Sequence, residues 1–370
     1  MRYDLIKVID RYGGGLLSLL LARFRKKQLR IPVHPRILVI MFWGIGSNIY
    51  VLPCIREIKK MMPGCRITVL APGKNKDIFY ANQYIDGYIF VDLKVRSLIR
   101  GLRAIAGKFD VCLDFEHWLM VSGIYSYFAA PSRIGFGNLK RRARLYSQNV
   151  LFDPEKHALL NNLKFIKLFG KSELDDSLVR IIASEEAASF AKTFIARNSI
   201  TKKIVGICPG SGPAVPERRW RAERFAEVAK NLIEHFHTDV VFIGVKEEQT
   251  LVESIQKRIP HTTWHTCGFK LGQTIAFIDQ CSLIISNDTG PVHLGASQAI
   301  PTIGLYGPES PVIFGPYGKR NISLFKPAPG CPFIKIYEGS YKRPYPLVDC
   351  MKDISVDDVM AAARKLLGKR

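Results

Sequence analysis

Three loops in the sequence have residue types that suit the binding of a phosphate group. They are residues 44–48 (GIGSN), 210–212 (GSG) and 286–293 (SNDTGPVH), and each follows an apolar run and precedes a stretch with helical spacing. Small residues at the start of a helix let backbone N–H groups approach an anion. A glycine-rich turn is also an ordinary connection between a strand and a helix, so each loop alone leaves both interpretations open.

The loop at 286–293 carries the densest set of polar side chains. Asp288 precedes Thr289 and Gly290, which offer hydroxyl and backbone donors, and His293 lies about one helical turn further on. A histidine on a helix is often a packed core residue, but His293 could also reach a phosphate group bound by Thr289 and Gly290. Ligands bind open α/β sheets at the carboxyl ends of strands, so this cluster favours a ligand site.

Basic residues follow the loop that contains Ser211. Arg218 and Arg219 stand directly before Trp220. Two guanidinium groups suit the bidentate recognition of phosphate. A solvated charge cluster beside a packed tryptophan is the other interpretation.

Two carboxylates could supply a general base. Asp114 and Glu116 flank the end of the apolar run at residues 111–115. A carboxylate in a cleft can remove a proton from a hydroxyl group. A surface turn explains the same pattern equally well.

Alternating strands and helices must position these loops. The first series has strands expected at 37–43, 67–70, 87–91 and 111–115, and helices at 49–62, 155–172 and 184–198. The second has strands expected at 204–208, 240–243, 283–286 and 302–306, and helices at 222–236 and 292–298. Such βα series predict two doubly wound α/β domains with parallel sheets that face one cleft.

The expected organisation has four parts. A basic amphipathic segment covers residues 1–35, a first domain 36–175, a second domain 176–345 and a C-terminal region 346–370. The polar stretch at 171–177 is the expected hinge, and the basic run at 138–147 is expected to be a loop. Ser355 and Asp358 form a capping-box pattern that begins the last helix. That helix is expected to pack back on the first domain.

The N-terminal segment contains a short apolar run, LLSLLLA at residues 16–22, with a basic flank. This run is shorter than the roughly 20 residues that span a bilayer, and no cleavage site follows it. We therefore expect neither secretion nor a membrane span. A helix at 16–31 could lie on an anionic leaflet or pack on the domain, with the glycines at 13–15 as a flexible joint.

The composition limits the classes of partner. The chain has 370 residues and a formal net charge of +22, which favours polyanions such as nucleic acid, anionic membranes or phosphorylated substrates. Its basic residues are not interleaved with aromatics in a nucleic-acid-binding pattern, so no nucleic acid is expected. The scattered cysteines and the absence of a CxxC pair indicate a reducing compartment and no metal site. Cys331 and Cys350 could be neighbours, but their spacing does not establish a pair.

Taken together, these pieces resemble glycosyltransferase family 9, the group that contains the ADP-heptose:lipopolysaccharide heptosyltransferases. The strongest piece is the block at 287–318, which is similar to the family's donor-site block. Supporting pieces are PGSG at 209–212, RRW at 218–220, RIGF at 133–136, the glycine-rich pattern at 44–53 and CMKDISVDDV at 350–359. The resemblance extends over about residues 36–360 in the family's order.

The resemblance implies a GT-B fold, with two Rossmann-like domains and the active site between them. It implies inverting transfer, without a metal or other cofactor, of heptose or another sugar from a nucleotide-diphosphate donor. The acceptor would be a lipopolysaccharide or other phosphorylated lipid-linked glycan. The enzyme would act in the cytoplasm, on the inner face of the cytoplasmic membrane, where an anionic membrane surface is a further partner.

The resemblance also assigns residues to the two halves of the site. The expected donor-binding residues are Ser211, Arg218, Asp288, Thr289, Gly290 and His293. The expected acceptor-binding residues are Gly46, Asn48, Arg133, Lys140, Arg141 and Arg142.

Two positions depart from the family pattern. The family commonly has an aspartate base where this chain has Ser47, and a serine hydroxyl without a partner is too weak a base. The candidate catalytic residues are therefore Glu116, Asp114 and Ser47. The alternative is a non-catalytic member that binds sugar nucleotide or glycan without turnover. Arg218 also stands where the family often has lysine.

Overall fold

A computed structural model describes residues 10–22, 28–92, 94–171, 173–212, 216–331, 333 and 348–368. These residues form two compact units, of which the first ends at Ser177 and the second begins at Leu178. Most of the predicted basic segment lies inside the described part, but residues 1–9 and 23–27 lie outside it. No described helix is long and apolar enough to cross a membrane.

The first unit contains a sheet of six parallel strands in the order β3-β2-β1-β4-β5-β6. The strands are β1 (Arg36–Ile40), β2 (Arg66–Ala71), β3 (Gly87–Phe90), β4 (Val111–Asp114), β5 (Ser132–Phe136) and β6 (Gln148–Val150). The helices are α2 (Gly15–Ala22), α3 (Ile45–Met61), α4 (Val95–Ile105), α5 (Met120–Ala129), α6 (Lys140–Ala143) and α7 (Ala158–Lys167). Four consecutive residues of β1 are buried, as expected for a strand with helices over both faces of its sheet.

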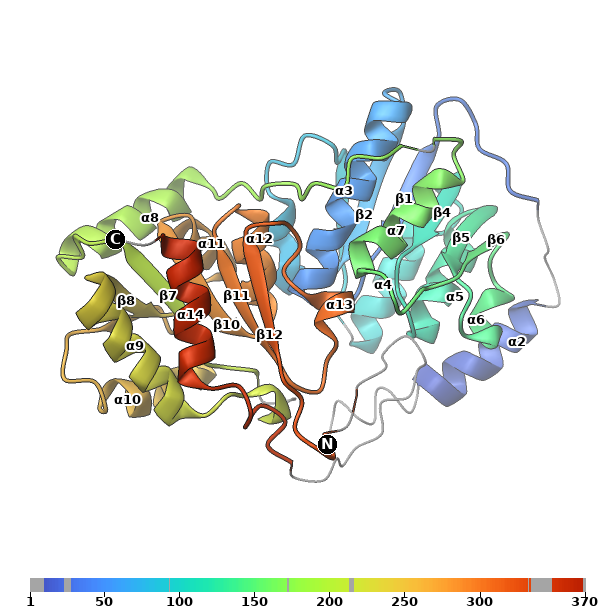
Figure 1. The fold of residues 1–370 in the computed structure, drawn as a ribbon. Coiled ribbons are helices and arrows are strands. Elements are labelled where there is room, and N and C mark those ends of the chain that lie inside the picture. Colours follow the sequence, from blue (N-terminus) through green and yellow to red (C-terminus); the bar gives the residue numbers. More distant parts are fainter. Residues whose placement is uncertain are drawn as a thin grey trace. The chain divides into compact units, whose positions relative to one another are not determined.

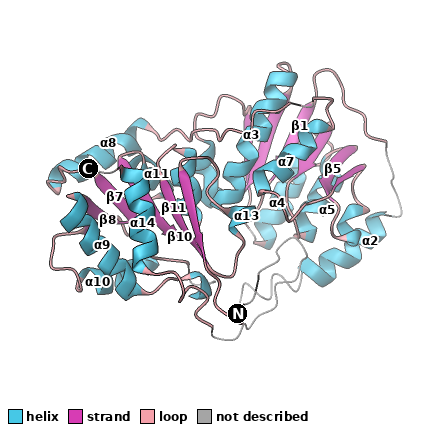
Figure 2. Cartoon of the chain, in the orientation of Figure 1, coloured by secondary structure: helices cyan, strands magenta, loops and turns pink. Residues whose placement is uncertain are grey.

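The second unit repeats this topology with the strand order β12-β11-β10-β7-β8-β9. Its strands are β7 (Ile204–Cys208), β8 (Asp239–Phe242), β9 (Trp264–His265), β10 (Cys281–Asn287), β11 (Thr302–Tyr306) and β12 (Asn321–Phe325). Its helices are α8 (Glu185–Arg197), α9 (Ala222–Phe236), α10 (Gln249–Gln256), α11 (Leu271–Ile278), α12 (Gly290–Ser297), α13 (Pro311–Phe314) and α14 (Val356–Leu367). The prediction of two doubly wound parallel sheets is confirmed (Figures 1 and 2).

The C-terminal helix was expected on the first domain, and this expectation is wrong. Helix α14 packs on α9 and on strands of the second sheet (Figure 1). Apolar residues of α9 recur at the spacing of one helical face, at Phe225, Val228, Ala229 and Leu232, and all four are buried. Val359 and Ala363 of α14 belong to the same core. The predicted capping box is confirmed by reciprocal hydrogen bonds between Ser355 and Asp358.

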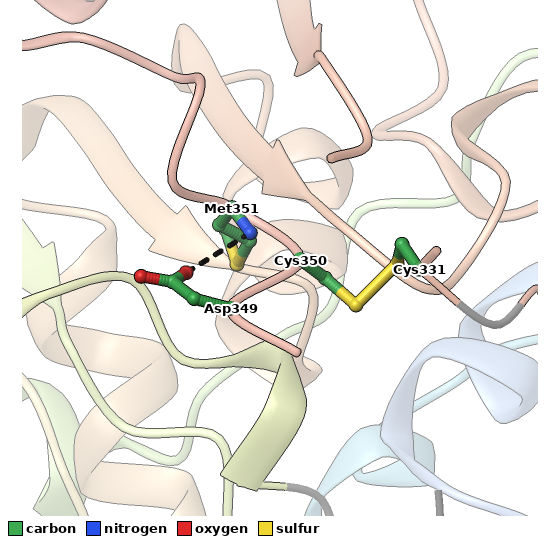
Figure 3. The surroundings of a disulfide bond; sticks show 4 residues. All are labelled: Cys331, Asp349, Cys350 and Met351. Atoms are coloured by element: carbon green, nitrogen blue, oxygen red, sulfur yellow. Dashed lines mark hydrogen bonds between the residues drawn. A yellow bond between two sulfur atoms is a disulfide. The ribbon is translucent and has the colours of Figure 1, made fainter. Parts of the chain in front are cut away.

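A disulfide joins the two C-terminal cysteines. Cys331 and Cys350, which are 19 residues apart in the sequence, are linked (Figure 3), and both contact the hydrophobic core of the second unit. Cys350 is buried next to Met351, whose backbone N–H donates to the carboxylate of Asp349. The bond anchors the segment that leads into α14.

The N-terminal helix is shorter than predicted. The structure describes α2 at Gly15–Ala22 and shows residues 28–31 as non-helical, while residues 23–27 lie outside the described part. The glycines expected to form a joint belong instead to a π-helical turn at Asp10–Gly14 and to the first residue of α2. The Asp10 carboxylate accepts hydrogen bonds from the backbone N–H groups of Met120 and Val121, which caps α5. Since α2 also packs against α5 and α6, this segment is part of the first unit.

Some predicted elements differ from the structure in extent. Helix α3 begins at Ile45, four residues before the predicted start at 49, so the glycine-rich loop supplies its first turn. The predicted loop at 138–147 contains the one-turn helix α6. Strands β5, β6, β9 and β12 were not predicted, because they are short or only partly apolar.

Candidate functional site

The clearest candidate site lies at the carboxyl ends of two adjacent strands of the second sheet. Strands β7 and β10 pair directly, and the strand order reverses between them. Such a reversal is the point at which doubly wound sheets bind ligands. The loop with Ser211 follows β7, and the loop with Thr289 follows β10, so the topology brings these two predicted loops together.

A buried asparagine ties the two loops to each other. The amide nitrogen of Asn287 donates to the carbonyl oxygens of Pro209 and Gly210, at 2.8 and 3.2 Å. Its amide oxygen accepts from the backbone N–H of Trp220 at 3.1 Å. All of its hydrogen bonds therefore hold backbone in place. The sequence analysis did not name Asn287 as a donor-binding residue, and its place inside the polar loop at 286–293 was the available signal.

Helix α12 directs its N-terminus into this region. Thr289 is the residue before the helix, but its side chain does not cap the first-turn N–H groups. Its hydroxyl donates instead to the carbonyl oxygen of Asn287 at 3.2 Å. Uncapped N–H groups and the helix dipole make such a terminus suited to an anion. His293 lies in α12 and is mostly buried, which agrees with the interpretation of this residue as part of the packed core.

The predicted donor residue Arg218 lies between two buried carboxylates. Its guanidinium is 3.1 Å from the Oδ2 atom of Asp288 and also forms an ion pair with Glu309. The side chain of Arg218 is 16% exposed, whereas those of Asp288 and Glu309 are 4% and 2% exposed. Burial raises the pKa of Asp288 and raises that of Glu309 to about 8, although Arg218 opposes both shifts. Sequence reasoning missed Glu309, which follows β11.

A third loop is connected through Glu248, in the turn after β8. Its Oε1 atom accepts from the backbone N–H of Gly212 at 3.0 Å, and its Oε2 atom accepts from that of Val245 at 3.2 Å. Gly210 packs so closely on this carboxylate that a Cβ atom there would collide with it. Of the two neighbouring glutamates of this turn, Glu247 and Glu248, it is Glu248 that contacts the loop. Ser211 is buried in the same loop.

In the first unit, Glu116 follows β4, and its side chain contacts the loop after β1. Its Oε1 atom accepts from the backbone N–H groups of Phe42 and Trp43, at 2.5 and 2.6 Å. Its Oε2 atom is buried and has no hydrogen-bond partner. Burial raises the pKa of Glu116 to about 8, and the charge of Asp114 adds to the rise, whereas Arg142 lowers it. The interpretation of this strand end as a surface turn is therefore wrong.

Asp114 belongs to a buried cluster with Arg142 and Tyr146. The Oδ2 atom of Asp114 accepts from the Arg142 guanidinium at 3.0 Å and from the Tyr146 hydroxyl at 2.6 Å. Arg142 also donates to the carbonyl oxygen of Glu116 at 2.7 Å. The side chains of Asp114 and Arg142 are both 0% exposed. Because its side chain is completely buried inside the unit, Arg142 cannot serve as the predicted ligand of an acceptor phosphate.

Arg133 is likewise not a surface ligand. It is 1% exposed and donates to the carbonyl oxygens of Leu145, Ala130 and Pro131. It therefore satisfies backbone carbonyls of irregular segments around β5. Lys140, in α6, and its neighbour Arg141 are exposed, so they remain available to an anionic acceptor.

The remaining predicted residues of the first unit lie in the first turn of α3. Gly46 is buried and Ser47 is half-buried. The amide nitrogen of Asn48 donates to the carbonyl oxygens of Trp43 and Gly44, both at 2.8 Å, so Asn48 supports the loop. Among the residues that the structure describes, no cluster of three or more His, Cys, Asp or Glu side chains is arranged to hold a metal ion.

Comparisons with known proteins bear on the same parts of the chain. Residues 95–332 match the family model of glycosyltransferase family 9 (heptosyltransferase). Lipopolysaccharide heptosyltransferase 2 of Escherichia coli K12 is 33% identical over 297 residues, which cover 75% of this chain and 84% of that protein.

Two solved structures have the same fold. A family 9 glycosyl transferase from Veillonella parvula superposes with a TM-score of 0.78 and 27% identity, over 92% of this chain and 99% of that one. The ADP-heptose lipopolysaccharide heptosyltransferase II of E. coli superposes with a TM-score of 0.70 and 20% identity, over 90% and 98% of the two chains. Both parallel sheets of the present chain thus lie within a known two-sheet fold.

Proposed function

Because the chain belongs to glycosyltransferase family 9, the heptosyltransferases, we propose that it transfers heptose, or a related sugar, from a nucleotide-diphosphate donor to a lipopolysaccharide or other lipid-linked glycan. One observation carries the donor half of this proposal. The uncapped N-terminus of α12 and the guanidinium of Arg218 lie together where the second sheet reverses its strand order. A diphosphate needs this combination of N–H donors and positive charge.

The chemistry follows from the charge that develops on the leaving group. As the bond between sugar and diphosphate breaks, negative charge accumulates on the departing phosphate. Arg218 and the positive end of α12 would stabilise that charge with groups already in place. We therefore propose a direct displacement that inverts the sugar centre and uses these groups, rather than a bound metal, to neutralise the diphosphate.

The acceptor hydroxyl must lose a proton during transfer. Asp114 is committed to Arg142 and Tyr146, so it acts as a positioning residue for the loop around Glu116. We propose Glu116 as the base, because its raised pKa of about 8 and its unpartnered Oε2 atom suit proton transfer near neutral pH. For this step the acceptor hydroxyl must reach Oε2 near the loop that leads from β1 into the first turn of α3, the turn that contains Ser47.

A second candidate function is supported by the burial of that same carboxylate. Glu116 is 0% exposed, and no aspartate stands at position 47. A family member with this arrangement could bind sugar nucleotide without turnover. Turnover by the wild type distinguishes the two functions. The Glu116→Gln variant then tests the base, because a glutamine oxygen still accepts from Phe42 and Trp43. Catalysis by Glu116 predicts a loss of kcat of at least 100-fold with an unchanged KM for the donor.

The acceptor is proposed to be anionic and to lie at the inner face of the cytoplasmic membrane. The net charge of +22 and the exposed Lys140 and Arg141 support this location. Leu17 and Leu20 of α2, which packs against α6, are 42% and 50% exposed and add apolar surface next to these cations. Vesicles that contain anionic lipid should therefore bind the wild type more strongly than a K140E/R141E variant.

The donor is tested directly by binding. Purified protein should bind ADP or another nucleoside diphosphate and the corresponding sugar nucleotide, measured by thermal shift and calorimetry. Arg218→Lys should weaken binding about tenfold, because a lysine cannot keep the two-sided guanidinium contacts. Arg221→Gln is the matched control, since Arg221 forms an exposed pair with Asp349. Absence of binding by folded wild-type protein to every nucleotide tested would refute the proposal.

A further inference from the structure

Glu309 places a second buried carboxylate against the arginine of the donor site. It follows β11 and forms an ion pair with Arg218, whose other side contacts Asp288. Both acids are almost completely buried. Arg218, which is 16% exposed, thus lies between two carboxylates that are almost completely buried. The Oε1 atom of Glu309 is buried without a hydrogen-bond partner.

The charges in this cluster do not balance when all three groups are ionised. One guanidinium and two carboxylates sum to a net charge of −1. Burial disfavours an uncompensated charge, so the two acids together retain one proton in the neutral range. Burial is the largest cause of the raised pKa of Glu309, to about 8, and the charge of Asp288 also raises it. Since the acids are coupled, the proton belongs to the pair.

The elements near this cluster carry other charged and titratable side chains. Helix α12 contributes His293, and α13 contributes no titratable side chain. Glu217 and Arg219 flank Arg218 in the segment before α9, and Glu248 of the turn after β8 contacts Gly212. The groups that act on the pKa of Glu309 are Arg218 and Asp288. The cluster can therefore be treated as one arginine with two acids.

We propose that Glu309 competes with the donor diphosphate for Arg218, and that the diphosphate binds only while the Asp288–Glu309 pair holds a proton. This inference rests on the proposed function, because it takes Arg218 as the cation of the donor site. With the proton in place the cluster is neutral, and Arg218 can turn to a phosphate oxygen. Without it, a net negative charge lies beside the N-terminus of α12 and repels the diphosphate.

The pH dependence follows from a one-proton linkage. A phosphate group has completed its second ionisation, with a pKa near 6, well below pH 7.5, so the ligand charge is constant above that pH. If one proton with a pKa of about 8 is required, the affinity of wild-type protein for a nucleoside diphosphate falls roughly 25-fold from pH 7.5 to 9.5. The affinity is expected to decrease with rising pH and not to pass through a maximum.

The test is a calorimetric titration with ADP, UDP, GDP and CDP at pH 7.5, 8.5 and 9.5. The Glu309→Gln variant keeps the shape of the side chain but removes one negative charge. Its affinity should lie within threefold of wild type at pH 7.5 and change less than threefold up to pH 9.5. Glu253→Gln is the control, because Glu253 is an exposed carboxylate on α10 that pairs with Gln249. It should reproduce the wild-type pH profile.

A second measurement uses wild-type protein alone, in case the variant does not fold. Titrations at pH 8.5 in buffers with different ionisation enthalpies count the protons taken up with each nucleotide. A substantial fraction of one proton is expected. No uptake, or the same pH dependence in Glu309→Gln as in wild type, would overturn the inference while leaving the proposed function intact. Failure of wild-type protein to bind any of the four nucleotides at pH 7.5 would overturn both.

Discussion

Replacing Asn287 by alanine tests whether this residue builds the donor site by holding its loops. The side chain makes three hydrogen bonds to backbone, with Pro209, Gly210 and Trp220. Each such bond contributes about 0.5–1.5 kcal/mol net, and the groups left behind are buried. Asn287→Ala should therefore destabilise the second unit by roughly 2–4 kcal/mol. Nucleotide affinity should fall by at least tenfold, because the loops that carry the N–H donors are released.

The assay needs a probe confined to one unit. Replacing Trp43 and Trp118 by phenylalanine leaves Trp220 and Trp264, both in the second unit, as the remaining tryptophans. Unfolding in urea followed by their fluorescence then reports the stability of that unit.

Asn321→Ala is the matched control for this prediction. The Asn321 side chain also makes two hydrogen bonds to backbone, with Thr302 and Tyr317, but it lies in β12. Asn321→Ala should lower the free energy of unfolding of the second unit by an amount similar to that in Asn287→Ala, without a specific loss of nucleotide affinity. Equal loss of affinity in both variants, under conditions where both are folded, would refute the assignment of Asn287 to the site. A loss of stability below about 1 kcal/mol in Asn287→Ala would refute the bond count.

Three further predictions concern other contacts. Gly210→Ala should weaken nucleotide binding several-fold, because the added Cβ would displace the Glu248 carboxylate from the backbone N–H of Gly212, and wild-type affinity in a calorimetric titration would contradict this. Reduction of the Cys331–Cys350 disulfide should lower the free energy of unfolding of the second unit by roughly 3 kcal/mol, because the bond closes a loop of 19 residues. An unchanged Tm in reductant would contradict this. Hydrogen bonds from Ser177 and the charge of Arg56 lower the pKa of Asp175 to about 2, below its unfolded value of 3.8. The ionised Asp175 therefore stabilises the folded state above pH 4, and this contribution is lost as the pH falls from 4 to 2. Because Asp175 is 43% exposed, Asp175→Asn should cost only about 1 kcal/mol at pH 7, and the cost should vanish near pH 2 in urea unfolding.

Strands that are apolar throughout could be predicted from the sequence with accurate bounds. The predicted strands at 204–208 and 302–306 and the helix at 222–236 coincide with β7, β11 and α9. Buried strands between two helical layers leave continuous apolar runs, and an amphipathic helix leaves a clear 3.6-residue period. Strand β9 has only two residues and β12 is half-buried, so neither leaves such a pattern.

The partners of polar residues could not be predicted in this way. The loops after β7 and β10 were assigned to one site because motif and topology agree. Asn287 and Glu309 were missed because their partners belong to neighbouring strand ends and become visible only once the strand order is known. Arg133 and Arg142 were expected to bind the acceptor, Arg133 from the family motif at 133–136 and Arg142 from the basic run at 138–147. The burial of Arg133 depends on backbone carbonyls in irregular loops, and that of Arg142 depends on Asp114, which lies far away in the sequence.

The two sheets share one topology but differ in the loops at the carboxyl ends of their central strands. After β1, the carboxylate of Glu116 accepts from the N–H groups of Phe42 and Trp43, so these donors are occupied by an acidic side chain of the protein itself. After β10, the first turn of α12 has no side-chain cap, and Arg218 lies beside it. At the first loop an anion therefore meets a carboxylate that occupies the N–H donors. At the second, the first turn of α12 is not capped by a side chain, and Arg218 lies beside it between Asp288 and Glu309. This asymmetry is the physical reason to assign the diphosphate to the second unit and proton transfer to the first.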